Sequence, residues 1–166
     1  MCIRDSHPFA PNKLENFLIY QSAINFVKKI KSKTDLKVYI VTNQPDLSRG
    51  NLSFKDLSRM NQKIFDNMPI DGIEYCKHLE ISNCNCRKPK PGMVLKIKKK
   101  EQIDLSNSIL VGDTWRDIFC GLSAGLKTYL LNKPYNQNYF YNLRINSLND
   151  LLSLIHISGP RDLSTS

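Results

Sequence analysis

Apolar residues recur first at helical and then at strand spacing along the chain. Ala23, Val27 and Ile30 follow one another every three or four residues, which predicts an amphipathic helix that Ser22 can cap. Residues 38–41 form a β-branched and aromatic run that ends in polar side chains. This run predicts a buried strand that opens into a loop.

The alternation of helix and strand patterns continues to about residue 131. Ser53 and Asp56 resemble a capping box, with Asp in place of the preferred Glu, ahead of an apolar helical stripe. The remaining expected elements are a short strand at 73–75, a helix from Pro91, a strand at 108–111, a helix at about 114–124 closed by Gly125, and a last strand at 128–131. Strands that alternate with helices predict an α/β fold of Rossmann type, with a mainly parallel sheet and helices on both faces.

Polar side chains stand where two of these strands end. Thr42, Asn43 and Gln44 follow the first strand, and Gly112 and Asp113 follow a later one. Ligands of parallel α/β sheets bind beyond the carboxyl ends of the strands, so the two groups are expected to share a site. The ordinary alternative is that Thr42 and Asn43 form a turn and that Asp113 caps a helix.

Length and composition narrow the class of protein. A chain of 166 residues with 41% hydrophobic and 23% charged residues fits one soluble domain. It has neither an apolar leader nor an apolar run of the ~18 residues that a membrane span needs, so the expected location is the cytoplasm. The net charge of +9 raises the question of a nucleic-acid partner. The lysines are spread along the predicted helices, however, which favours solvated faces and a small anionic ligand over nucleic acid.

Both ends of the chain resemble a translated sequencing adaptor. The codons ATG TGT ATA AGA GAC AG, which encode the start of the chain, have a reverse complement that reads Leu-Ser-Leu-Ile-His, and this peptide occurs at residues 152–156. One inverted repeat, similar to a transposon end used in library preparation, therefore accounts for both ends. We expect residues 1–6 and 152–166 to be foreign and residues 7–151 to be the protein domain.

Four soft ligands lie within eleven positions after the strand at 73–75. Cys76 and His78 form one arm of this clip, and Cys84 and Cys86 form the other. Three thiolates and one imidazole match a structural tetrahedral zinc site, in which four protein ligands leave no open position. In a cytoplasmic chain such clustering favours metal over disulfide bonds. We therefore predict a zinc-binding loop inserted in the fold.

A basic loop follows the clip directly. Arg87 and Lys88 open residues 87–92, where two prolines stiffen the chain. A guanidinium and an ammonium held side by side suit a phosphate group, although a solvated basic loop is the alternative. Asp113 can supply a hard oxygen ligand for magnesium, and Asp117 lies one helical turn further on.

Taken in order, these motifs resemble the haloacid-dehalogenase (HAD) superfamily of phosphatases. Within it they are similar to the group that contains the histidinol-phosphate and D-glycero-D-manno-heptose 1,7-bisphosphate phosphatases. The segments that carry the resemblance are residues 41–50, the clip, residues 87–93 and residues 111–113. The resemblance implies a phosphomonoesterase of a small phosphorylated sugar, which works through an aspartyl-phosphate intermediate and needs Mg²⁺ and Zn²⁺.

The same resemblance implies roles for individual residues. Thr42 and Asn43 match the segment that binds the transferring phosphate. Lys88 matches the lysine that neutralises the charge of phosphate and nucleophile, and Asp113 matches a magnesium ligand. The other expected contacts to the substrate or its phosphate are Gln44, Arg49 and Arg87.

Two departures from the family pattern change what is expected of this chain. Thr114 stands where the sugar-bisphosphate enzymes often have Lys, and the opening D-x-D-G strand with its nucleophile has no counterpart, since Asp5 lacks a partner two residues earlier. We therefore expect an N-terminally truncated piece, without the first strand of the sheet and without phosphatase activity. The alternatives are a histidinol-phosphate phosphatase and a non-catalytic zinc-containing module that binds phosphosugars or nucleic acid. The oligomeric state and the natural substrate stay open.

Overall fold

The computed structural model describes residues 11 and 13–156, and its elements follow the predicted alternation. The helices are α1 (Gln21–Lys33), α2 (Asp46–Arg49), α3 (Phe54–Asn67), α4 (Gly92–Glu101), α5 (Trp115–Ser123) and α6 (Leu148–His156). The strands are β1 (Tyr39–Asn43), β2 (Gly72–Cys76), β3 (Ile109–Gly112), β4 (Lys127–Leu131) and β5 (Arg144–Ile145). Short 3₁₀ turns are η1 (Leu14–Asn16), η2 (Glu80–Ser82) and η3 (Pro134–Asn136). The expected foreign residues 1–6, with Asp5, lie outside the described residues.

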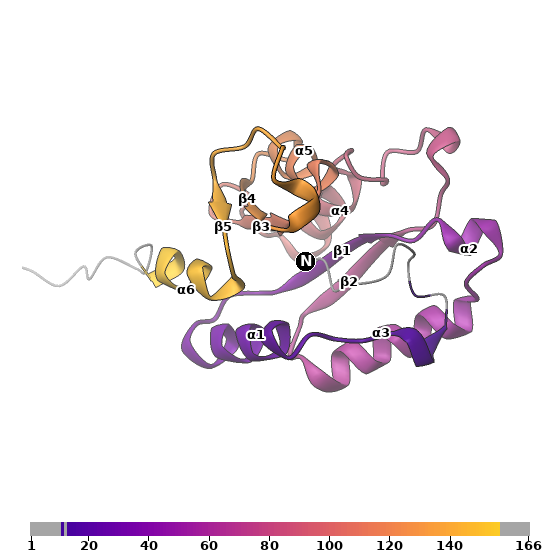
Figure 1. Ribbon diagram of the computed structural model, residues 1–166, viewed down its shortest axis with the longest axis horizontal. Helices are drawn as coiled ribbons and strands as arrows, with labels where there is room; N and C mark the ends of the chain where they lie inside the picture. Colours follow the sequence, from indigo (N-terminus) through magenta and orange to yellow (C-terminus); the bar gives the residue numbers. More distant parts are fainter. Residues whose placement is uncertain (1–10, 12, 157–166) are drawn as a thin grey trace, which may run out of the picture.

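Every strand pair in the described residues is parallel, as predicted, but the strands form two sheets (Figure 1). β1 pairs with β2, and β4 pairs with β3 on one side and with β5 on the other. No ladder of the described residues joins β1 to β3. The expectation that the first strand of the sheet is missing stays a prediction, because residues 1–10 and 12 lie outside the described residues. β1 and β3 are the strands that end in the predicted site residues.

Helices cover both faces of the strands, which confirms the predicted layers (Figure 1). Neighbouring residues of β1 point to opposite sides: Ile40 packs into a core with α1, α3 and α6, whereas Val41 packs with α4 and α5. The first core also contains Tyr129 from β4 and Ile145 from β5, and the second contains Leu110 from β3. The two sheets therefore share one layer between two apolar cores, although no strand pairing joins them.

Local sequence signals explain where the helices begin and end. Ser53 caps α3 as predicted: its Oγ accepts the backbone N–H of Asp56 at 3.0 Å and donates to the carboxylate of Asp56 at 2.7 Å. Gly125 follows α5 with a φ of +80°, a conformation that favours glycine. Among the residues that the structure describes, no helix is long and apolar enough to cross a membrane.

The C-terminal part differs from the prediction. β4 is not the last strand, because β5 follows it. β5 has only two residues, too few to give a periodic signal. Helix α6 runs across the boundary that the adaptor match sets after residue 151. Leu151 and Leu152 are both buried in the first core, so the apolar side chain of Leu152 contributes to this fold whatever its origin.

We expect Gly121→Ala to lower the free energy of unfolding by about 2 kcal/mol. A Cβ at this position on α5 would lie 2.2 Å from Oγ1 of Thr128, which is fully buried on β4. Overpacking of about 3 kcal/mol exceeds the ~1 kcal/mol that alanine gains in helix propensity. Urea unfolding followed by circular dichroism measures the effect. Ser123→Ala, on the exposed side of the same helix, is the control and should shift stability by less than about 0.5 kcal/mol.

Candidate functional site

Asn43, at the end of β1, fastens the basic loop to the sheet. Its Nδ2 donates to the backbone O of Lys88 at 3.1 Å, and its Oδ1 accepts the backbone N–H of Lys88 at 3.0 Å. The nitrogen and the oxygen of one side-chain amide therefore both bind the backbone of Lys88. Beside this contact, Nε2 of Gln44 donates to Oγ1 of Thr42 at 3.3 Å. The structure thus brings the predicted strand end and the predicted phosphate-binding lysine together.

The side chain of Lys88 reaches from β1 to α5. Its Nζ donates to the backbone O of Val41 at 2.9 Å and to Oδ1 of Asp117 at 2.5 Å. The side chains of Lys88 and Asp117 are only 12% and 8% exposed, so this is a buried ion pair. An ammonium group has three N–H donors, and these two bonds leave one for a further acceptor. The pair joins the end of one sheet to the helix that follows the first strand of the other.

Asp117 is fixed by the start of α5. Its Oδ2 accepts the backbone N–H of Thr114 at 3.1 Å and the hydroxyl of Thr114 at 2.6 Å, which makes these two residues the capping box of the helix. A Cβ on Gly112 would lie 2.1 Å from Cβ of Asp117, so only glycine lets the end of β3 lie this close to Asp117. Burial alone would raise the pKa of the Asp117 carboxyl, but the ammonium of Lys88 and the bond from Thr114 hold it below its usual range.

Asp113 lies just beyond β3 and is 1% exposed. It does not cap α5, because Thr114 and Asp117 do. The hydroxyl of Tyr135 donates to Oδ2 of Asp113, and the side-chain amide of Asn136 donates to the backbone O of Asp113 at 2.8 Å. Both partners belong to η3, the turn after β4. A buried carboxylate at a strand end is the kind of hard oxygen donor that suits magnesium.

The two predicted arginines contact other groups of the described residues. Nη1 of Arg87 donates to the backbone O of His78 at 3.3 Å, and the buried Nε–H of Arg87 has no hydrogen-bond partner in residues 11 and 13–156. A buried donor without an acceptor is costly, so an anion or a water molecule is expected there. Arg49, about half exposed on α2, pairs with Asp46 at 3.2 Å, and no hydrogen bond or ion pair of the described residues links it to Lys88.

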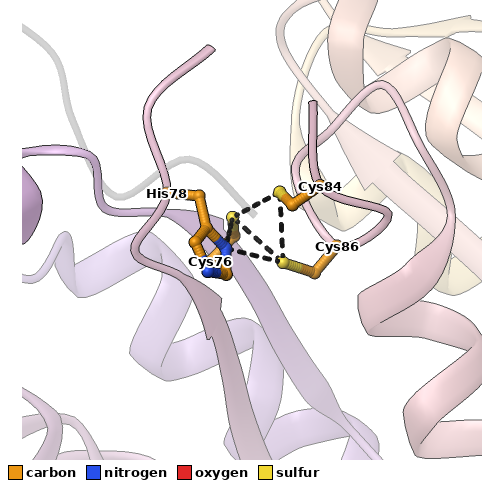
Figure 2. Close-up of side chains that lie close together, drawn as sticks. All are labelled: Cys76, His78, Cys84 and Cys86. Carbon is orange, nitrogen blue, oxygen red and sulfur yellow. Dashed lines mark hydrogen bonds between the residues drawn. The ribbon is translucent and has the colours of Figure 1, made fainter. Parts of the chain in front are cut away.

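The four predicted metal ligands come together at the end of β2 (Figure 2). The ligand atoms of Cys76, His78, Cys84 and Cys86 all lie within 4.8 Å of one another. The Sγ atom of Cys86 is 3.2 Å from that of Cys76, 3.4 Å from that of Cys84, and 3.2 Å from Nδ1 of His78. Tetrahedral ligands on Zn–S bonds of about 2.3 Å stand about 3.8 Å apart. The cluster is therefore compatible with a zinc site.

The thiols of the clip differ in their pKa values. Burial raises the pKa of Cys86 to about 12, and Cys76 and Cys84 add to the rise. Burial acts on Cys84 in the same direction, but hydrogen bonds from the Cys86 thiol and from the backbone of Arg87 lower the pKa of Cys84 to about 6. Several thiolates side by side repel one another, and a divalent cation removes that repulsion.

The clip also positions the basic loop. The backbone N–H of Gly92 donates to the backbone O of Asn85 at 3.0 Å, and a Cβ on Gly92 would lie 2.2 Å from that oxygen. Nζ of Lys90 donates to the backbone O of Asn83 at 3.1 Å and to its Oδ1 at 2.6 Å. The clip and the basic loop are therefore one packed unit, from which Lys88 extends towards β1.

Comparison with known proteins gives the family. The model of the family described as polynucleotide kinase 3 phosphatase matches residues 1–139. The D-glycero-β-D-manno-heptose-1,7-bisphosphate 7-phosphatase of Helicobacter pylori is 34% identical over 123 residues, which cover 70% of this chain and 70% of that protein. The corresponding α-D-manno-heptose enzyme of Campylobacter jejuni is 32% identical over 135 residues, covering 78% of this chain and 77% of that protein. The chain belongs to the HAD-type phosphatases.

A solved structure supports the HAD fold. The D,D-heptose 1,7-bisphosphate phosphatase of B. bronchiseptica, crystallised with magnesium and phosphate, superposes with a TM-score of 0.82 and covers 94% of this chain and 93% of that one. The two sequences are 23% identical, so this likeness shows the shared fold.

Three residues of this HAD-type phosphatase site are not predicted by the sequence. The spacing of Asp117, three residues after Thr114, is that of a capping box, but it does not reveal the bond to Lys88. No local pattern links Tyr135 and Asn136 to Asp113, twenty-two and twenty-three residues earlier. Only the packing of η3 on the end of β3 reveals them.

We expect Asp117→Asn to lower the free energy of unfolding by about 3 kcal/mol near pH 7, because Lys88 then stays buried without a counter-charge. The pKa of Asp117 is lowered in the folded protein. The stabilisation is therefore present above the unfolded pKa of about 4 and is lost as the pH falls through the folded value. The difference between the two proteins should shrink below about pH 4. Urea unfolding at several pH values measures it.

The matched control for this prediction is Asp66→Asn. Asp66 lies on an exposed turn of α3 and accepts a hydrogen bond from Gln62, so its loss should change stability by less than about 0.5 kcal/mol. If Asp117→Asn were as stable as this control, Lys88 would not depend on Asp117 for its charge.

Proposed function

We propose that this chain binds a D-glycero-D-manno-heptose 1,7-bisphosphate as part of a phosphatase that removes the 7-phosphate. The observation that carries the proposal is the buried ammonium of Lys88, which uses two of its three N–H donors on acceptors of the described residues, at the end of β1 and on α5. The named activity of the Helicobacter and Campylobacter relatives supports the choice of substrate. Both anomers are candidates, because one relative is named for the β form and the other for the α form.

Asn43 and Lys88 give the phosphate site its rigidity. The loop that carries Lys88 is held by two hydrogen bonds from one amide, so its charge is in place before a ligand arrives. Preorganised charge of this kind stabilises a phosphoryl group more than a mobile lysine would. Thr42 adds a hydroxyl at the same strand end, and the buried Nε–H of Arg87 offers a donor to a further substrate oxygen.

Magnesium is the proposed catalytic ion. Asp113 fits it through a buried carboxylate at the end of β3, and Mg²⁺ typically takes one or two carboxylates together with phosphate oxygens. When bound, the ion would add positive charge on the transferring phosphoryl group, and Lys88 would neutralise the same group from the side of β1.

Zinc is the proposed structural ion. Four protein ligands would fill its tetrahedral shell, which leaves no place for a substrate. It would hold the basic loop through Cys86, the direct neighbour of Arg87. Thiolate ligands persist in a reducing compartment, which supports the cytoplasm as the proposed location.

The attacking carboxylate is proposed to come from outside residues 11 and 13–156. Near the strand ends, Asp46 pairs with Arg49, Asp117 pairs with Lys88, and Asp113 is assigned to magnesium. None of the three is left to attack phosphorus. Without a covalent nucleophile, binding and charge stabilisation recover only a small part of the rate. We propose that the 166-residue chain, in which Asp5 has no partner two residues earlier, binds the bisphosphate without releasing phosphate.

We expect about one zinc ion per chain in protein purified without chelators under reducing conditions. The motivation is the ligand set of the clip, with its atoms within 4.8 Å of one another. Elemental analysis gives the stoichiometry. Cys84→Ser should lose most of the metal, whereas Cys120→Ser, which changes a buried cysteine outside the clip, should retain it. Zinc-free wild-type protein would remove this assignment.

We expect Lys88→Ala to weaken binding of the bisphosphate by roughly 10- to 100-fold, since a charged hydrogen bond contributes about 1.5–3 kcal/mol. Isothermal titration calorimetry with Mg²⁺ present measures it. Lys90→Ala is the matched control, because Lys90 lies on the same loop but contacts Asn83. This variant should bind within about twofold of wild type.

Competing ligands test the substrate class. Histidinol phosphate and an oligonucleotide with a 3′-phosphate should bind more weakly than the bisphosphate; the second is included because of the family description and the net charge of +9. Equal binding by wild type and Lys88→Ala would refute the proposed site. Steady release of phosphate, abolished by Asp5→Asn, would instead show that a carboxylate outside the described residues attacks.

A further inference from the structure

The turn after β4 places a tyrosine hydroxyl on the carboxylate proposed to bind magnesium. Tyr135 donates to Oδ2 of Asp113, although the tyrosine itself is 53% exposed and the aspartate is 1% exposed. An exposed ring gains little from burial, and phenylalanine would pack there as well as tyrosine does. The hydroxyl is therefore the feature that distinguishes this side chain at this position.

Asn136 explains why Tyr135 stands where it does. Its side chain is fully buried, and its Nδ2 donates at 2.8 Å both to the backbone O of Asp113 and to the backbone O of Leu131. Its Oδ1 accepts the backbone N–H of Lys133 at 3.0 Å. One amide thus ties the start of η3 and the end of β4 to the end of β3, and the preceding residue, Tyr135, is carried to the carboxylate.

We propose that Tyr135 is a positioning residue for the metal-binding carboxylate of Asp113, an inference that rests on the proposed function. A donor on one carboxylate oxygen fixes the rotation of the whole group, so the second oxygen is presented to a cation in one direction. Partners that orient metal ligands in this way typically contribute 10- to 100-fold to metal affinity.

The test is metal binding, which does not need turnover. The probe is Mn²⁺, which takes the same oxygen ligands as Mg²⁺ and is counted in its free form by electron paramagnetic resonance. Zinc-loaded 166-residue chain is titrated as wild type, Tyr135→Phe, Tyr141→Phe and Asp113→Asn, with Mg²⁺ as competitor. Tyr141 is the matched control, since it lies on the same loop and its hydroxyl donates to the backbone O of Thr128 at 2.8 Å instead.

We expect Tyr135→Phe to weaken Mn²⁺ binding by roughly tenfold, Tyr141→Phe to leave it within about twofold, and Asp113→Asn to abolish it. Thermal unfolding midpoints that match between the two Phe variants show that the loop is intact in both. Unchanged or tighter binding by Tyr135→Phe, with Asp113→Asn impaired, would overturn this inference alone. Wild type and Asp113→Asn that behave alike, including no binding by either, would overturn the magnesium assignment and this inference with it.

Discussion

The positively charged side chain of Lys88 is largely buried, and the other contacts of the site are arranged around its charge. A buried ammonium is strongly destabilising unless an anion is already in position, and Asp117 supplies the anion at 2.5 Å. Asp117 is positioned in turn by the capping box with Thr114 and by the close passage that Gly112 allows. The start of α5, the end of β3 and the basic loop are therefore mutually dependent. Through its bond to the backbone O of Val41, Lys88 also links this unit to β1. The two sheets share apolar cores but no ladder among the described residues.

The clip limits the conformational entropy that the basic loop loses on ligand binding. A loop that projects two basic side chains towards a ligand would lose much conformational entropy on ordering, about 1–2 kcal/mol for each residue of its backbone. Cys86 precedes Arg87 directly, and Gly92 packs against Asn85, so the clip and the basic loop order together. In the proposed zinc-bound form, the free energy of metal binding would offset that entropy. The structural metal would then serve the phosphate site without touching the phosphate.

The segment after β4 contributes to the site from the other direction. Arg144, on β5, donates to the backbone O of Asn136 at 3.1 Å, to Tyr141 O at 3.1 Å, and to Oδ1 of Asn132 at 2.7 Å. One guanidinium thus donates hydrogen bonds to several points of the loop that carries η3 and fixes its conformation. Because β5 pairs with β4, the position of this loop depends on the sheet itself. Asp113 is consequently held by backbone and side-chain contacts that come from outside its own strand and helix.

Local pattern was enough to predict the helices α1, α3, α4 and α5, the strands β1 to β4, and the ligand set of the clip. In each case the signal lies within a few residues: apolar spacing for Ile30 or Ile40, capping chemistry for Ser53, and ligand spacing for Cys84 and Cys86. Sequence also predicted that Thr42, Asn43 and Asp113 would lie at strand ends, because polar residues follow apolar runs there.

Tertiary structure alone decided what those residues contact. The pairing of Lys88 with Asp117 spans twenty-nine positions, and the bond from Tyr135 to Asp113 spans twenty-two. No periodic signal extends so far, since such contacts depend on the register of whole strands and on the packing of helices against them. The two-residue strand β5 was missed because its pairing with β4, not its own composition, makes it a strand. Sequence thus determined the elements and the chemical groups of the site, whereas the packing of distant segments determined which groups meet.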